Sequence, residues 1–493
     1  MYHISDVKKF TRCPRLYALS LQEDKETYQP YVRLDEEVTG LAARKLGVEG
    51  KVFKGEKNDE PAKAQEALQS CDWLIKARFE YRQLRIKVPF LHRTENGWDL
   101  YFLFIGLYPH ADDIQFYCDT VWVLENNHIA LNNIRIVHLN ASYVRHGELD
   151  PDQLFVLSDH FYNNKNNPSV PIKETIYQKM KDVSGILDAM DALQGKEMPA
   201  PVHTNKCTTR QKCRYYTQCF QNEKKEPDNS ILTLIASQHK HEMYKEGRLT
   251  LKEADMNRIE ASRQQFAQIM ADQEGGLHVD VMALRSWLSH ISYPIAFLDF
   301  EWERFAIPPY EGMKPYDVLP FEYSLHVMQK DGTVTHKVYL NIHDDRKDMA
   351  ASLVKDIPSA GSVIAYNAEG AEKIRIQEFA DLFPEYADKL LSINARMEDL
   401  QLPFETGAVY DVRMRGQWSL KVIMAMMHDL SYQDLDINQG MEAVFQWRYL
   451  DHSDPDVDQE KIISDLEKYC GMDSYAMTVV YKWLLKLSEK DPL

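Results

Sequence analysis

One stretch of the chain combines an apolar run with two carboxylates at strand spacing. Residues Ile295 to Leu298 are continuously apolar, which predicts a buried strand that continues through Phe297-Leu-Asp-Phe-Glu301. Side chains alternate along a strand, so Asp299 and Glu301 point to the same face, a few ångströms apart. Such a pair is often a solvated strand edge. On a central strand, however, unpaired charges are costly, and the repulsion between two carboxylates is relieved by a cation. The pattern therefore predicts a divalent-metal site.

A second stretch, residues 462–477, repeats its apolar residues at helical spacing and predicts an amphipathic helix. Tyr469 and Asp473 are four residues apart, so they share one face of that helix. This helix is far from the predicted strand in the sequence, so its tyrosine and carboxylate can approach the two acids of the strand only if the tertiary fold packs the helix against it. The helix is therefore the second candidate source of site residues.

An acid-x-acid strand followed far downstream by a Tyr-x-x-x-Asp helix resembles the DnaQ-like (DEDD) 3′–5′ exonucleases. The resemblance implies a ribonuclease H-like fold for residues 291–493. It also implies two Mg²⁺ or Mn²⁺ ions held by Asp299, Glu301 and Asp473, which activate water and stabilise the phosphate in the transition state. Tyr469 would help to orient the attacking water.

The middle motif of those enzymes, Asn-x-x-Phe-Asp, has a looser counterpart here. The run of residues 362–373 predicts a strand, a loop and a helix, with Glu372 as the best match and Asn367 ahead of it. Glutamate is one methylene longer than aspartate, so the helix that carries it would have to lie slightly farther from the metal. Glu369 competes for the role, and a surface helix start with glutamate favoured by the helix dipole is the plain alternative.

Two further residues are candidates for supporting roles. Asp399 resembles the acid that follows the middle motif. With Asn367 it would hold the metal ligands in position through hydrogen bonds without binding the metal itself. Ordinary loop capping is the alternative. Ser419-Leu-Lys421 begins a predicted helix and places Lys421 near a phosphate path, although a plain helix start explains the same residues.

The chain of 493 residues is long enough for two to four domains, and its charge is unevenly distributed. The formal net charge is −17, yet residues 1–220 hold 29 basic and 29 acidic residues, whereas residues 221–493 hold 29 and 46. The negative electrostatic field of the whole protein therefore argues against nonspecific binding of polyanions. Nucleic acid would be held by local basic patches and metal bridges.

One such patch coincides with a cysteine motif. No acidic residue occurs between Glu197 and Glu223, and the interval contains three cysteines at a spacing of six. Its basic residues are the predicted nucleic-acid contacts: Lys206, Arg210, Lys212 and Arg214. A closed metal site needs a fourth ligand, and Cys13 is the candidate to join Cys207, Cys213 and Cys219.

One cysteine near the N-terminus and three that close the domain resemble the iron–sulfur RecB-like nucleases of CRISPR adaptation and recombination. The resemblance implies a restriction-endonuclease-like domain over residues 1–222 and a structural 4Fe–4S cluster. Zinc fits the same ligands, and unliganded thiols are the other alternative. The family's D…E-x-K positions correspond to Pro89, Phe102 and Phe104, none of which binds metal. This domain is therefore expected to keep the fold without the chemistry.

Taken together, the chain resembles a bacterial family that fuses the two kinds of domain. The stretches that carry this resemblance include Ala141 to Asp150, Leu298 to Trp302, Ala306 to Tyr310, Pro320 to His326 and Tyr469 to Asp473. Between the domains, residues 223–290 form a predicted helical linker with helical periodicity from Leu249 to Gln273. The expected fold is α/β, in two modules joined by helices.

The expected function is a metal-dependent 3′–5′ exonuclease whose inactive RecB-like domain binds or positions single-stranded DNA or RNA. The alternative is a non-catalytic nucleic-acid-binding or assembly subunit of a DNA-processing or mobile-element defence system, with other subunits as partners. No signal peptide and no apolar run long enough to span a bilayer is evident, so a cytoplasmic protein without membrane partners is expected.

Overall fold

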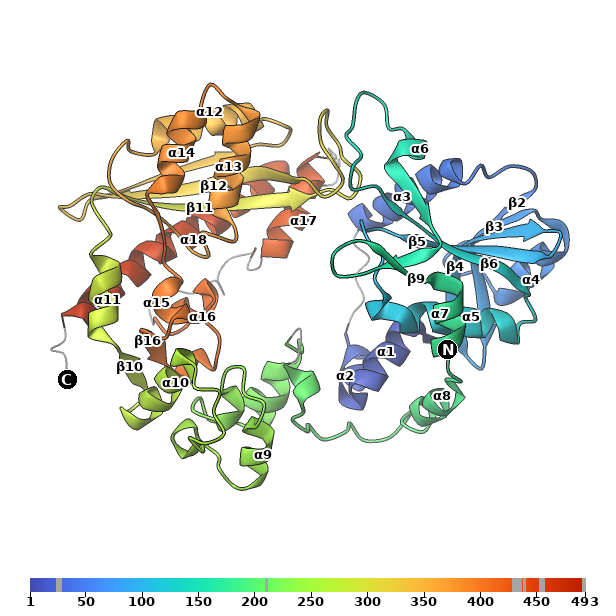
Figure 1. Ribbon diagram of the computed structural model, residues 1–493, viewed down its shortest axis with the longest axis horizontal. Helices are drawn as coiled ribbons and strands as arrows, with labels where there is room; N and C mark the ends of the chain where they lie inside the picture. Colours follow the sequence, from blue (N-terminus) through green and yellow to red (C-terminus); the bar gives the residue numbers. More distant parts are fainter. Residues whose placement is uncertain (24–28, 209–211, 428–436, 438–439, 452–456, 490–493) are drawn as a thin grey trace. The chain divides into compact units, whose positions relative to one another are not determined.

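The computed structural model describes the chain except residues 24–28, 209–211, 428–436, 438–439, 452–456 and 490–493. The chain divides into two compact units. The first comprises Met1–Cys219 with Arg304–Asp317, and the second comprises Phe220–Glu303 with Val318–Leu493. Both units mix helices with strands (Figure 1), which confirms the predicted α/β class.

The first unit is built on a seven-stranded sheet with the order β2-β3-β4-β5-β6-β7, in which β1 also pairs with β4. The motif positions Pro89, Phe102 and Phe104 lie on β4 and β5, which pair antiparallel. The elements are β1 Tyr2–His3, α1 Ile4–Arg12, α2 Pro14–Ser20, α3 Gln29–Lys45, β2 Val52–Lys54, α4 Pro61–Ser70, β3 Trp73–Tyr81, β4 Leu84–Thr94, β5 Gly97–Phe104, α5 Ile114–Asn126, β6 Leu131–Leu139, α6 Pro151–Leu154, β7 Phe155–Ser158, β8 His160–Tyr162, β9 Pro168–Pro171, α7 Ile172–Lys179 and α8 Ser184–Asp191.

Residues 304–317 belong to the first unit although they connect two strands of the second. Ala306 and Ile307 are buried in the same apolar cluster as Trp73 of β3. The Arg145 guanidinium donates hydrogen bonds to the carbonyls of Pro308 and Pro309, at 2.9 and 2.6 Å. Two of the stretches that carry the family resemblance, 141–150 and 306–310, therefore contact each other within this unit.

The second unit contains a five-stranded sheet with the order β13-β12-β11-β14-β15. β12 and β13 pair antiparallel, and β14 pairs parallel with both β11 and β15. The elements are α9 Lys240–Lys245, α10 Arg263–Gln273, β10 Leu277–Val279, α11 Val281–Leu288, β11 Ile295–Arg304, β12 Val318–Met328, β13 Val334–Leu340, α12 Arg346–Asp356, β14 Val363–Ala365, α13 Glu372–Leu382, α14 Ala387–Ala395, β15 Met397–Asp399, α15 Leu402–Glu405, β16 Val409–Asp411, α16 Leu420–Met424, α17 Gly440–Asp451 and α18 Gln459–Ser488.

Helices cover both faces of this sheet, and the alternation along β11 decides which side chain meets which layer. Ala296, Leu298 and Phe300 pack in a cluster with residues of α12, α13 and α14. Ile295 and Phe297 face the opposite side, in a cluster with residues of α18 (Figure 1). Asp299 and Glu301 continue this second row, so their side chains lie on the α18 face.

Residues 223–290 belong to the second unit. The predicted helical periodicity over 249–273 is only half right, because the helix α10 begins at Arg263. Upstream, the Glu253 carboxylate accepts hydrogen bonds from the amides of Leu249 and Thr250, both at 2.8 Å, around a single 3₁₀ turn. The Ser262 hydroxyl then caps α10. Local side-chain hydrogen bonds thus interrupt the helix. Within the described ranges, no helix is both long and apolar enough to cross a membrane.

Candidate metal centre

The acid pair lies on the central strand of the five-stranded sheet, as the sequence predicted. Ile295 to Leu298 are fully buried, and Asp299 and Glu301 follow as half-buried side chains. The apolar half of β11 fixes the strand between two helical layers, and the polar half then presents both carboxylates toward α18. Burial of the strand is therefore what orients the pair.

The third carboxylate comes from α18, a helix of 30 residues. Asp458 caps its N-terminus by accepting a hydrogen bond from the Lys461 amide at 3.0 Å. Tyr469 and Asp473 lie on the face that meets the sheet and are 3% and 8% exposed. The prediction that these two residues share one helix face is confirmed, and that face is buried.

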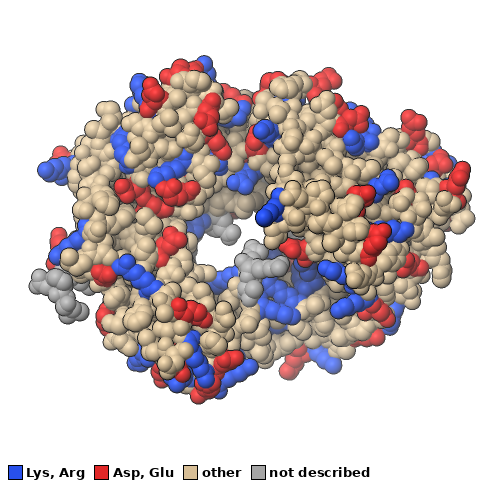
Figure 2. All heavy atoms as spheres, in the orientation of Figure 1, with Lys and Arg blue, Asp and Glu red and all other residues tan. Residues whose placement is uncertain are grey.

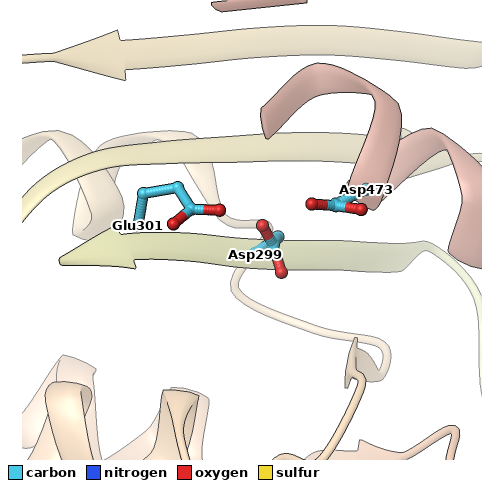
Figure 3. Close-up of side chains that lie close together, drawn as sticks. All are labelled: Asp299, Glu301 and Asp473. Atoms are coloured by element: carbon cyan, nitrogen blue, oxygen red, sulfur yellow. The ribbon is translucent and has the colours of Figure 1, made fainter. Parts of the chain in front are cut away.

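Asp299, Glu301 and Asp473 converge in space (Figure 3). One carboxylate oxygen of each lies within 4.8 Å of the others, and this is the sole such group of three among the described residues. Burial and the charges of Asp473, Glu301 and Glu372 raise the pKa of Asp299 well above its usual value. Burial and the charges of Asp473 and Glu322 raise the pKa of Glu301 in the same way. The triad is therefore strained by like charge and is suited to hold a cation.

Glu372 lies beside the triad as the first residue of α13. Its side chain is 2% exposed, and its Oε2 atom has no hydrogen-bond partner. Burial raises its pKa to about 8, with the charge of Asp399 adding to the effect. Its competitor Glu369 is exposed and forms an ion pair with Lys373. The structure thus brings Glu372, and not Glu369, to the carboxylates.

The two candidate supporting residues differ in what they contact. Asp399 is buried at the end of β15 and accepts hydrogen bonds from the amides of Asn367 and Gln401, at 2.9 and 2.8 Å. It therefore holds the loop that precedes Glu372. The Asn367 side chain is exposed and lies against Gly370, so it is not brought to the triad. Asn367 adopts a left-handed backbone conformation, with φ of +64°, which asparagine tolerates well.

Tyr469 and Lys421 form a pair next to the carboxylates. The Lys421 ammonium donates to the Tyr469 hydroxyl at 3.1 Å and lies 5.1 Å from the centre of its ring. Its positive charge lowers the pKa of Glu301, against the larger effects that raise it. Burial and the charges of Asp473, Glu301 and Asp299 raise the pKa of Tyr469. The phenol therefore stays protonated, and Lys421 places a cation at the edge of the site.

Two buried groups near the site were missed from the sequence. Glu322 of β12 is fully buried, neither of its carboxylate oxygens has a hydrogen-bond partner, and burial with the charges of Glu467 and Asp473 raises its pKa. The Cys470 thiol lies 3.7 Å from Asp299 Oδ2. A signal for Glu322 existed, because polar residues recur at every second position of the otherwise apolar β12, at Glu322, Ser324 and His326.

The four candidate cluster ligands, Cys13, Cys207, Cys213 and Cys219, come from the two ends of the first unit. The Arg12 guanidinium donates to the Lys206 carbonyl, at 2.9 Å from Nη2. Arg15 is buried and donates from Nε to Cys219 Sγ at 3.3 Å. Burial and the neighbouring Cys13 and Cys213 raise the pKa of Cys207. Although all four are described, no three of their sulfur atoms lie mutually within 4.8 Å.

The basic residues of the same segment are engaged in contacts within the first unit. Lys206 donates to the Thr11 carbonyl at 3.1 Å, Lys212 lies 4.7 Å from the centre of the Tyr216 ring, and Arg214 pairs with Glu23. Arg210 lies outside the described residues. Figure 2 shows basic side chains gathered over α1 and α2, the helices that this segment contacts.

The positions that correspond to a RecB-like nuclease motif lie in or beside the apolar core. Phe102 is 1% exposed and forms an edge-to-face pair with Tyr117 at 4.7 Å between ring centroids. Phe104 packs against the same cluster, and Pro89 lies on β4. This region of the first unit therefore contributes packing and no metal ligand.

A family profile described as a domain of unknown function (DUF2779) matches residues 296–419. The matched segment contains Asp299, Glu301 and Glu372 and ends before Tyr469 and Asp473. Neither the curated proteins nor the solved structures include a match to the chain.

Proposed function

We propose that the second unit is a metal-dependent 3′–5′ exonuclease of the DnaQ type, with a ribonuclease H-like fold, acting on single-stranded DNA or RNA. The observation that carries the proposal is the convergence of Asp299 and Glu301 with Asp473, a residue far downstream on α18. The central position of the acid-bearing strand in a mixed sheet between helices supports the same fold. Carboxylates gathered in this way are the ligands of hard divalent cations.

The residues present fit Mg²⁺ or Mn²⁺. The three carboxylates of the triad place one oxygen each within 4.8 Å of the others. Glu372 adds a buried oxygen, Oε2, that has no hydrogen-bond partner. Asp299, Glu301 and Asp473 would hold the ions, with Glu372 completing the ligand set. Such ions, when bound, lower the pKa of water and offset the charge that develops on a phosphate.

The chain's own residues supply the remaining chemistry. In hydrolysis the water oxygen bonds to phosphorus and the P–O3′ bond breaks. The Tyr469 hydroxyl accepts a hydrogen bond from Lys421, and as a protonated phenol it would donate toward water or a phosphate oxygen. The positive charge of Lys421 also lowers the pKa of Glu301, and it would attract the phosphate backbone.

We further propose that the first unit is a degenerate RecB-like domain that binds or positions the nucleic acid. Its motif positions are occupied by core residues such as Phe102. Its basic segment, with Lys206, Lys212, Arg214 and Arg210, would contact phosphates. The gathering of basic side chains over α1 and α2 supports this role (Figure 2).

Cys13, Cys207, Cys213 and Cys219 would hold a 4Fe–4S cluster that joins the N-terminal and C-terminal segments of this unit. A tetrahedral zinc site with bonds of about 2.3 Å places its sulfurs about 3.8 Å apart. No three of Cys13, Cys207, Cys213 and Cys219 approach within 4.8 Å. The wider spacing favours a polynuclear cluster, whose thiolates bind different iron atoms.

The cluster is tested by metal analysis of anaerobically purified protein. Cys213→Ser is expected to lose iron and acid-labile sulfide and to melt at a lower temperature, because a ligand that staples distant segments is removed. Cys71→Ser, a buried cysteine of the same unit outside the group, is the matched control and is expected to keep its iron. Zinc in place of iron, or equal iron in both variants, would contradict the assignment.

The exonuclease is tested with end-labelled single-stranded DNA and RNA in the presence of Mn²⁺ or EDTA. Wild-type protein is expected to shorten the strand from its 3′ end only with Mn²⁺. The Asp299→Ala/Asp473→Ala variant is expected to be inactive, because it removes two of three ligands from the same centre.

Substrate preference in that assay decides between DNA and RNA. Binding of both strands without metal-dependent cleavage by the wild-type protein would reject the exonuclease. That outcome would instead support a non-catalytic nucleic-acid-binding or assembly subunit. Cleavage that persists in the double variant would place the active site elsewhere.

A further inference from the structure

A hydrogen-bonded chain of side chains, buried except for its outer histidine, joins α18 to the sheet directly beside the metal centre. Ser474 Oγ lies 2.6 Å from Ser324 Oγ of β12 and 2.8 Å from His326 Nδ1 of the same strand. Ser324 Oγ lies 2.9 Å from His336 Nε2 of β13. Ser324 and Ser474 are fully buried, and His326 is 7% exposed. Four polar side chains therefore hydrogen-bond to one another across the contact between α18 and the sheet.

The helix approaches the sheet closely at this point. A methyl group added at Gly471 would lie 3.2 Å from His336 Cε1, so the absence of a side chain there admits the imidazole. The rings of His326 and His336 stack at 4.1 Å between centroids, with 13° between their planes. The polar chain thus runs from the buried serines out to the exposed His336, whose ring lies between Gly471 and the His326 ring.

The position of this chain along α18 matters for the metal ligands. Ser474 follows Asp473 directly and lies little more than one turn after Tyr469. Farther along the helix, the contacts with the sheet are apolar and come from residues such as Met477 and Val480. Apolar burial is nondirectional and tolerates small rotations of a helix, whereas hydrogen bonds fix distance and angle. Ligand carboxylates must be held within about 0.5 Å of their working positions.

We propose that Ser474, through Ser324 and His326, is a positioning residue that sets the rotation and depth of α18 and thereby places Asp473 and Tyr469 in the metal centre. The proposal rests on the proposed function of that centre. It assigns no contact with substrate or metal to the serine itself. Its action passes through the helix backbone to the neighbouring carboxylate.

The test compares Ser474→Ala with Thr478→Val. Thr478 lies one turn further along α18, is 1% exposed, and donates its hydroxyl to the Tyr475 carbonyl of the same helix. Both substitutions remove a buried hydroxyl from α18, but only Ser474→Ala removes bonds to the sheet. Ser324→Ala is the second variant, since it breaks the same chain from the strand side.

The measurements are the Mn²⁺ dissociation constant by calorimetry, the melting temperature, and kcat and KM on the preferred strand. Ser474→Ala and Ser324→Ala are expected to weaken Mn²⁺ binding about tenfold and to lower kcat about 10- to 100-fold with KM unchanged. Thr478→Val is expected to lower the melting temperature while Mn²⁺ affinity and kcat stay at the wild-type values.

The outcomes separate this inference from the proposed function. Wild-type protein that neither binds Mn²⁺ nor cleaves would reject the exonuclease itself. Wild-type binding with unchanged Mn²⁺ affinity in both serine variants would overturn the positioning role alone. Equal losses of affinity in Thr478→Val would also overturn it, because general loosening of α18 would then explain the effect.

Discussion

Replacing Asp299 by asparagine is expected to abolish cleavage and, in the same protein, to stabilise the metal-free fold. Loss of one ligand carboxylate should lower kcat/KM at least about 10³-fold, equivalent to about 4 kcal/mol of transition-state stabilisation. The opposite effect on stability follows from charge. Burial and the charges of Asp473, Glu301 and Glu372 raise the pKa of Asp299, so its ionised form is disfavoured in the metal-free protein.

The sign of the pH dependence follows from the same shifts. A carboxyl whose pKa is raised in the folded state contributes stability at low pH, and that stability is lost as pH rises toward the folded value. Glu372 has a pKa of about 8, raised chiefly by burial. Burial lowers the pKa of His326 to about 4 from 6.5, so above pH 6.5 this histidine loses its remaining charge only in the unfolded state, a smaller effect of opposite sign. Metal-free wild type should therefore melt at a lower temperature at pH 8 than at pH 6.5.

Calorimetry in EDTA and in Mn²⁺ at the two pH values measures these effects together with the cleavage assay. Asp299→Asn should show a shallower loss of stability between pH 6.5 and 8 and little stabilisation by Mn²⁺. Asp388→Asn, at an exposed aspartate of the same unit, is the control and should behave as wild type. A metal-free Asp299→Asn protein that melts at a lower temperature, with the Mn²⁺ response intact, would show the carboxylate to be an ordinary structural group.

The geometry of the acid pair and of the Tyr469/Asp473 face could be predicted because each depends on local periodicity alone. A strand period of two places Asp299 with Glu301, and an i,i+4 spacing places Tyr469 with Asp473. The meeting of the two elements could not be derived from periodicity. It was expected only from the resemblance to an exonuclease family, and the structure brings the three carboxylates together.

The errors have physical causes that periodicity does not record. The helix expected from Leu249 begins at Arg263, because side-chain caps around Thr250 and Ser262 compete with helical hydrogen bonds. Glu322 was missed although Ser324 and His326 repeat on the same side of β12, because that alternation does not tell whether the polar side faces solvent or a packed helix. The partners of Lys206 and Arg214 were unpredictable as well, since they come from the far end of the first unit, at Thr11 and Glu23.

The second large effect separates the two glutamates of the middle motif. Glu372→Gln is expected to lower kcat about 10²-fold, because a buried carboxylate beside Asp299 loses its charge while its shape is kept. Glu369→Gln is the matched control from the same loop. It removes an exposed ion pair with Lys373, and exposed pairs contribute at most about 1 kcal/mol, so kcat should not change.

The comparison also decides what the longer side chain does at this position. If Glu372 binds metal, Glu372→Gln should weaken Mn²⁺ binding as well as kcat, and it should raise the melting temperature of the metal-free protein, because a carboxyl with a pKa of about 8 is replaced by a neutral group. If Glu369→Gln instead lost Mn²⁺ affinity and kcat, the metal-binding role would belong to the exposed Glu369. Unchanged kcat in both variants would mean that Asp299, Glu301 and Asp473 alone are sufficient to bind the catalytic metal. Glu372 would then only add electrostatic repulsion, which bound cations relieve.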